Sequence, residues 1–130
     1  MIGLDSNVII RYLAQDDDVQ SPMTDELMDG LSIVEPGFVS VVVLVETYWV
    51  LSRLFKMHGE PLLYQLDGII SAEQIRIEKE ELVRRAFRLA QEGADFADAL
   101  IKLAGDDQGC EYTLTFDKGA VKNAGMRLFA

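Results

Sequence analysis

Two short apolar runs of this sequence lead into an aspartate, and this placement limits the folds open to the chain. Met1–Leu4 stops at Asp5, and Tyr112–Thr115 is followed by Phe116 and then by Asp117. Each run has the length and composition of a buried strand. In open α/β sheets the ligand crevice lies outside the carboxyl ends of the strands, so both aspartates are expected to face such a crevice.

Strand-like and helix-like segments alternate along the chain. Strands are expected at 1–4, 38–40, 74–77 and 110–115, with an edge strand at 128–129, and helices at 7–14, 22–30, 41–55, 61–70, 78–92 and 95–104. The expected N-caps are Ser6, Ser21 and Ser40. The alternation predicts an α/β fold with a mainly parallel sheet and right-handed crossovers. The 130 residues contain no repeat or linker, so a single domain over 1–130 is expected.

The composition is that of an ordinary globular protein, with 49% apolar and 26% charged residues. Cys110 is the only cysteine, so no internal disulfide can form. The first residues lack the features of a signal peptide, and no apolar run reaches the roughly 18 residues of a membrane helix. A cytoplasmic location without membrane contact is therefore expected.

The chain is acidic, with 12 Lys and Arg against 22 Asp and Glu and a net charge of −10. This charge repels a polyanion and argues against a protein that coats nucleic acid. It suits an enzyme that meets phosphates through bound divalent cations, and it also suits a basic protein partner.

Two further acids interrupt apolar, helix-like stretches. Glu46 lies in the middle of 41–55, which is apolar nearly all round and is expected to be buried. The nearest basic residue is Arg53, about two helical turns away, which is too far for a local ion pair. Asp98 lies in a second apolar stretch, whereas Asp95 has an ordinary explanation as an N-cap or first-turn acid. Buried carboxylates cost several kcal/mol unless they are paired or bind a metal.

These acids come from four separate segments of the chain and offer only oxygen ligands. Oxygen ligands suit hard cations, so the set predicts Mg2+ or Mn2+. His58 and Cys110 each stand alone, without the partners that a zinc site or a Cys-His nucleophile needs. The predicted chemistry is metal-assisted hydrolysis of a phosphodiester.

Four segments together resemble the PIN-domain family, and most closely its VapC-like toxins: MIGLDSNVIIRYL, VVLVETYWVLSRLF, FADALI and TLTFDK. The resemblance covers nearly the whole chain. It implies a three-layer α/β/α sandwich with about five strands, cleavage of RNA with Mg2+ or Mn2+, inhibition by a cognate antitoxin, and a homodimer.

Matched motif by motif, the resemblance implies metal-binding and catalytic roles for four acids: Asp5, Glu46, Asp98 and Asp117. Polar neighbours that would support them are Asn7, Thr115 and Asp95. Basic residues that could contact RNA phosphates, if they border the crevice, are Arg11, Lys102 and Lys118.

Other functions fit the sequence less well. An aspartyl phosphatase needs a second aspartate two residues after the first, where this chain has Asn7. A phosphoreceiver domain needs an adjacent acidic pair after its first strand, whereas Asp5 stands alone there. A module that only binds basic partners would spread its acids over exposed faces. A catalytically inactive, PIN-like interaction domain is the alternative to the nuclease.

Overall fold

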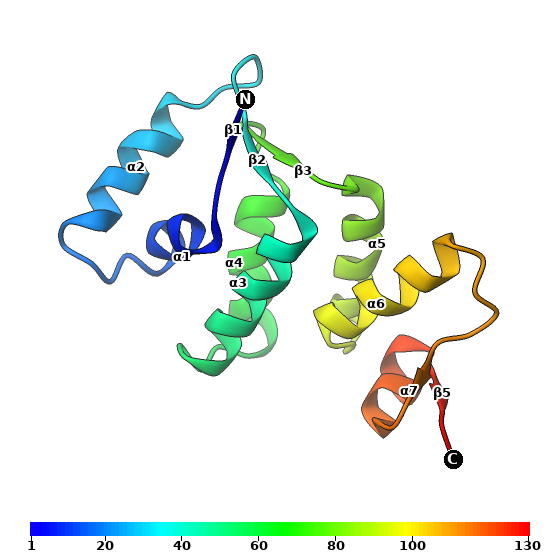
Figure 1. The fold of residues 1–130 in the computed structure, drawn as a ribbon. Helices are drawn as coiled ribbons and strands as arrows, with labels where there is room; N and C mark the ends of the chain where they lie inside the picture. The colour runs from blue at the N-terminus through cyan, green and yellow to red at the C-terminus, as the bar shows by residue number, and fades with distance from the viewer. The chain divides into compact units, whose positions relative to one another are not determined.

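The computed structural model describes residues 1–130, which form two compact units, Met1–Glu80 (unit 1) and Glu81–Ala130 (unit 2) (Figure 1). The elements follow in the order β1 (Ile2–Gly3), α1 (Ser6–Ala14), α2 (Gln20–Gly30), β2 (Gly37–Val39), α3 (Val41–Arg53), α4 (Gly59–Ile70), β3 (Ile75–Ile77), α5 (Glu80–Gln91), α6 (Phe96–Asp107), β4 (Leu114–Thr115), α7 (Lys118–Ala124) and β5 (Arg127–Leu128). The α/β class and the parallel strands expected from the sequence are confirmed. That both units form one domain stays a prediction.

Unit 1 contains a parallel sheet of three strands, with β2 between β1 and β3 (Figure 1). Ile2 pairs with Gly37, and Gly37 pairs with Ile75, so all three carboxyl ends lie at one edge. A side chain on Gly37 would come within 2.8 Å of Leu4, which explains why glycine occupies this place in the central strand. Helix α1 packs against α2 and α3, α3 against α4, and α4 against β3.

The helix starts differ in part from those expected. Ser40 caps α3 as predicted, because its hydroxyl accepts a hydrogen bond from Val43 N at 3.2 Å. The prediction of Ser6 as the cap of α1 was wrong, since the N-cap is Asp5 and α1 begins at Ser6. Helix α2 begins at Gln20, one residue before the predicted cap Ser21.

Asp17, in the acidic run before α2, accepts hydrogen bonds at the start of this helix, a role that was expected of Ser21. The carboxylate of Asp17 accepts hydrogen bonds from Val19 N at 3.0 Å and from Gln20 N at 2.6 Å. These bonds to the charged form lower the pKa of Asp17. The acidic run is therefore part of the structure of the α1–α2 connection and not only a solvated loop.

Helix α3 is less buried than its composition predicts. Its buried side chains are Leu44, Thr47 and Leu51, while Val42 is 75% and Trp49 44% exposed. Only one stripe of the helix therefore belongs to the core, and apolar residues on the other faces are left at the surface. The expectation of a helix enclosed all round was wrong.

Unit 2 is built from α5, α6 and a small β4-α7-β5 arrangement with two parallel strands. Asp95 caps α6, as one of the two explanations for it predicted. Asp117 is the N-cap of α7, a helix that was not expected from the sequence and that ends at Gly125 in the left-handed conformation (φ 77°). The five expected strands are thus divided between the two units. No helix has the length and apolarity needed to cross a membrane.

The cap of α3 can be tested by stability. Ser40→Ala removes the acceptor for Val43 N and should lower the free energy of unfolding by about 1 kcal/mol. Ser52→Ala makes the same change in the last turn of α3, where no cap is lost, and should be neutral or slightly stabilising. Urea unfolding of both variants measures the difference, and equal losses would contradict the role of Ser40.

Candidate active site

Asp5 stands where β1 ends and α1 begins, at the carboxyl edge of the sheet in unit 1. Its Oδ1 accepts a hydrogen bond from Ser6 N at 2.8 Å, and its side chain is exposed. The start of a helix favours a negative charge there. One carboxylate oxygen thus serves the cap, and the other is available to a ligand. Asn7, in the first turn of α1, is also exposed.

Glu46 is joined to this position through Ser6. The buried hydroxyl of Ser6 donates a hydrogen bond to Glu46 Oε1. Ser6 therefore bonds to Asp5 through its backbone and to Glu46 through its side chain, so the structure brings these two predicted acids together. Glu46 itself is exposed, and the expectation of a buried carboxylate was wrong because α3 presents this face to the surface.

The sequence analysis missed Glu78 at the same edge of the sheet. Glu78 follows β3 directly, and its Oε1 accepts a hydrogen bond from Val41 N at 2.9 Å at the start of α3. Its backbone N–H bonds to Val39 O at 3.0 Å and extends the pairing with β2. The signal was present in the sequence, because Glu78 stands directly after a strand, as Asp5 does.

In unit 2, aspartates stand at the starts of α6 and α7. Asp95 caps α6 by accepting a hydrogen bond from Asp98 N at 2.9 Å. Asp117 caps α7 by accepting from Gly119 N at 2.7 Å, and its own N–H donates to Thr115 Oγ1 at 3.0 Å. Thr115 therefore helps to fix the backbone from which Asp117 projects.

The charges of these aspartates affect one another. Partial burial raises the pKa of Asp98, and the neighbouring carboxylates of Asp95 and Asp117 raise this pKa further. Asp98 is thus close enough to Asp95 and to Asp117 for its charge to be repelled by theirs, although the start of a helix stabilises a negative charge. A bound cation would relieve this repulsion.

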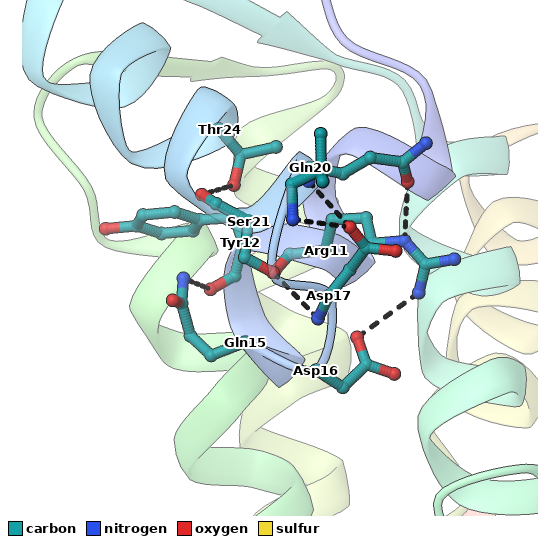
Figure 2. A network of polar contacts seen from close by, with 9 residues as sticks. Arg11, Tyr12, Gln15, Asp16, Asp17, Gln20, Ser21 and Thr24 are labelled. Atoms are coloured by element: carbon teal, nitrogen blue, oxygen red, sulfur yellow. Dashed lines mark hydrogen bonds and ion pairs between the residues drawn. The ribbon is translucent and has the colours of Figure 1, made fainter.

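The basic residues predicted to meet RNA have different surroundings. Arg11 donates to Asp16 at 3.2 Å and to Gln20 at 2.8 Å, as Figure 2 shows. Lys102 pairs with Asp106 at 2.6 Å. Lys118 is exposed in the first turn of α7. Arg11 and Lys102 therefore hold acids of their own units in this structure.

The donor chemistry of the site suits a hard divalent cation. The acids and the neighbouring hydroxyls offer oxygen atoms only, with neither histidine nor cysteine beside them. Within neither unit do three such side chains meet at a common metal-binding point. The acids occur instead as Asp5 with Glu46 in unit 1 and, in unit 2, as Asp98 with the carboxylates of Asp95 and Asp117 near it.

Comparison with known proteins gives a match to the model of the PIN domain over residues 2–125. The chain belongs to the PIN domain family. PIN domains are generally nucleases and usually use divalent metal ions. The matched span of this PIN domain includes the four acids singled out from the sequence: Asp5, Glu46, Asp98 and Asp117. None of the curated proteins compared with the chain matches it.

The raised pKa of Asp98 predicts a dependence of stability on pH. A folded-state pKa above the usual 3.8 means that Asp98 contributes stability below that pH and loses it as the pH rises through the folded-state pKa. At pH 7 without divalent cations, Asp98→Asn should therefore raise Tm, and the gain should shrink as the pH falls toward 3.8. Thermal unfolding in EDTA at several pH values between 3.8 and 7 measures this change in Tm.

The control is Asp29→Asn, which makes the same change of charge at an exposed position near the end of α2. It corrects for the general effect of lowering the negative charge of the protein. If Asp98→Asn does not raise Tm above this control at pH 7, the start of helix α6 outweighs the repulsion and the prediction is wrong.

Proposed function

We propose that this PIN domain is an endoribonuclease dependent on Mg2+ or Mn2+, and that it is the toxin of a VapBC-like toxin-antitoxin pair. The observation that carries the proposal is the group Asp95, Asp98 and Asp117 inside the span that matches the PIN domain, in which partial burial and then the charges of the two neighbouring carboxylates raise the pKa of Asp98. Mutual repulsion of this kind is costly for a fold and useful for binding a cation.

We propose metal-binding roles for the four acids of the sequence analysis, which are Asp5 and Glu46 in unit 1 and Asp98 and Asp117 in unit 2. A bound Mg2+ or Mn2+ would neutralise charge on the scissile phosphate and lower the pKa of the attacking water. Asp95 would act on the site through Asp98, because the carboxylate of Asp95 accepts a hydrogen bond from the backbone N–H of Asp98.

The side chains around these acids orient them. Ser6 directs Glu46 toward the end of β1 by donating its hydroxyl proton to Glu46 Oε1. Thr115 accepts from the backbone of Asp117 and holds the start of α7 in place. Asn7, exposed in the first turn of α1, can bond to water or to the substrate. Such contacts hold the acids in place before the substrate binds, so less entropy is lost when the reacting groups are positioned.

The proposed partners follow from charge and from the family resemblance. RNA reaches a protein with a net charge of −10 through cations and not through a basic surface. A cognate antitoxin with basic residues would be attracted by the same acids and would block them. We further propose a homodimer and a cytoplasmic location, where RNA is at hand.

Metal binding is tested first, with the purified and partner-free protein. Isothermal titration with Mn2+ should show saturable binding to the wild type, weakened at least about tenfold in Asp5→Asn and in Asp98→Asn. Both variants keep an amide oxygen at a helix start, and asparagine also caps helices, so folding should be retained. Asp29→Asn should bind Mn2+ like the wild type, and circular dichroism confirms the fold of each variant.

Cleavage is tested with the same proteins on a pool of cellular RNA. The wild type should cut RNA only with Mg2+ or Mn2+, and Asp5→Asn or Asp98→Asn should reduce the rate by ~100-fold or more, as loss of one charge-stabilising group does in other enzymes. Mn2+ binding without any cleavage would contradict the nuclease. Absence of both would favour the inactive, PIN-like interaction domain.

A further inference from the structure

A cavity of about 300 Å3 lies in unit 1, lined by Asn7, Val8 and Arg11 of α1 and by Gln20 and Met23 of α2. This volume is at the small end of the roughly 300–1,000 Å3 of ligand pockets. Its wall begins at Asn7, two residues after Asp5, and reaches Arg11 one helical turn later. The cavity therefore begins in the first turn of α1, the turn that Asp5 caps.

The orientation of Gln20 follows from its partner. Arginine has only donors, so the atom of Gln20 that faces Arg11 Nε, at 2.8 Å, must be the amide oxygen Oε1. The amide nitrogen of Gln20 then points away from Arg11, as Figure 2 shows, with two N–H donors to offer. Gln20, which lines the cavity, thus uses its acceptor for Arg11 and keeps its amide donors for a ligand.

Arg11 is fixed at the cavity with part of its donor set in use. Nε donates to Gln20 and Nη1 to Asp16, while the other terminal nitrogen makes none of the contacts drawn in Figure 2. These two contacts restrict the guanidinium before a ligand binds, so less side-chain entropy is lost when a ligand bonds to it. Arg11 is therefore a preorganised donor.

The charge of Arg11 is largely offset by its neighbours. Asp16 forms an ion pair with it. The pKa of Asp17 is lowered chiefly by hydrogen bonds from Gln20 N and Val19 N, and the charge of Arg11 adds to this effect. A phosphate would meet these two carboxylates as well as the guanidinium. A neutral acceptor avoids that repulsion and still receives the hydrogen bonds.

The apolar part of the lining suits a flat ring. Met23, whose side chain is 65% exposed, and Val8 contribute the apolar surface. Thioether groups pack favourably against aromatic rings. Sequence-specific proteins hold the unstacked bases of single-stranded RNA by contacts to the base face and by hydrogen bonds to the base edge. Among the bases, guanine presents two adjacent acceptors, N7 and O6, with no donor between them, and arginine is the side chain that most often meets them.

We infer that the cavity between α1 and α2 binds one unpaired base of the RNA substrate and prefers guanine. The inference rests on the proposed ribonuclease function and extends it to a preference in sequence. Arg11 and Gln20 donate to the base edge, and Val8 and Met23 cover its face. The base belongs to a nucleotide next to the phosphate that lies near Asp5.

Binding is measured without cleavage, by fluorescence anisotropy in EDTA. The probes are octauridylate and the same octamer with one central guanosine, adenosine or cytidine. The wild type should bind the guanosine octamer about tenfold tighter than the other three, which is the discrimination expected from one good bidentate contact. Equal affinity for all four, or no binding of any, overturns the inference.

Gln20→Glu removes the two amide donors and keeps an acceptor for Arg11, so the contact between α1 and α2 is retained. The preference for guanosine, measured as the affinity for the guanosine octamer divided by that for the other octamers, should disappear in this variant. A uniform weakening of binding to all octamers leaves this ratio unchanged. Gln65→Glu is the matched control, because Gln65 lines a different cavity between α1 and α4 and should leave the ratio unchanged. Retained preference in Gln20→Glu overturns the inference.

The outcomes separate this inference from the proposed function. A guanosine preference lost in Gln20→Glu, with no RNA cut under any metal condition, supports the base site and contradicts the nuclease. Metal-dependent cleavage that is identical in sequence pattern for the wild type and Gln20→Glu supports the nuclease and contradicts the base site. In the wild type, the side-chain amide resonance of Gln20 should also shift with the guanosine octamer while that of Gln65 stays in place.

Discussion

The junction between a strand and the following helix determines where the acids of this protein lie. The first N–H groups of a helix lack partners within the helix and need an acceptor from outside it. Asp5 supplies this acceptor after β1, and Asp117 supplies it after β4. Because the acceptor is a carboxylate, the same side chain that starts the helix also places a negative charge beyond the carboxyl end of a strand. Folding and the proposed chemistry thus depend on the same carboxylate group.

The two roles of these carboxylates, as helix caps and as proposed cation ligands, place different requirements on the side chain. Asparagine caps a helix about as well as aspartate does, but it carries no charge. At Asp5 and Asp117 the fold therefore needs an acceptor, whereas a cation would need the carboxylate. Asp98 differs, since its charge costs stability because the carboxylate is partly buried and lies near those of Asp95 and Asp117. A residue whose charge the fold would be better without is a stronger sign of function than a residue that also caps.

The sequence predicted features that depend on short-range patterns. Ser40 as a cap and the strand Ile75–Ile77 are both found, because capping and β-branched alternation act within a few residues. The surroundings of Glu46 were predicted wrongly, because composition does not tell which faces of α3 find partners in the tertiary structure. Its contact with Ser6 joins residues 40 positions apart and leaves no local signal. Glu78 was missed for the opposite reason, since its helix-forming neighbours masked its place at a strand end.

An acidic protein that acts on RNA must obtain its specificity without a basic surface. Phosphate contacts by lysine and arginine position a protein on nucleic acid, whereas contacts to base edges carry sequence information. In unit 1 the charge of Arg11 is offset by its ion pair with Asp16, while its N–H groups remain good donors (Figure 2). A net charge of −10 then weakens indiscriminate attraction to polyanions, which would otherwise hold the enzyme on any RNA. The two proposed modes of binding, through a cation at the scissile phosphate and through hydrogen bonds at a neighbouring base, both require a substrate that fits.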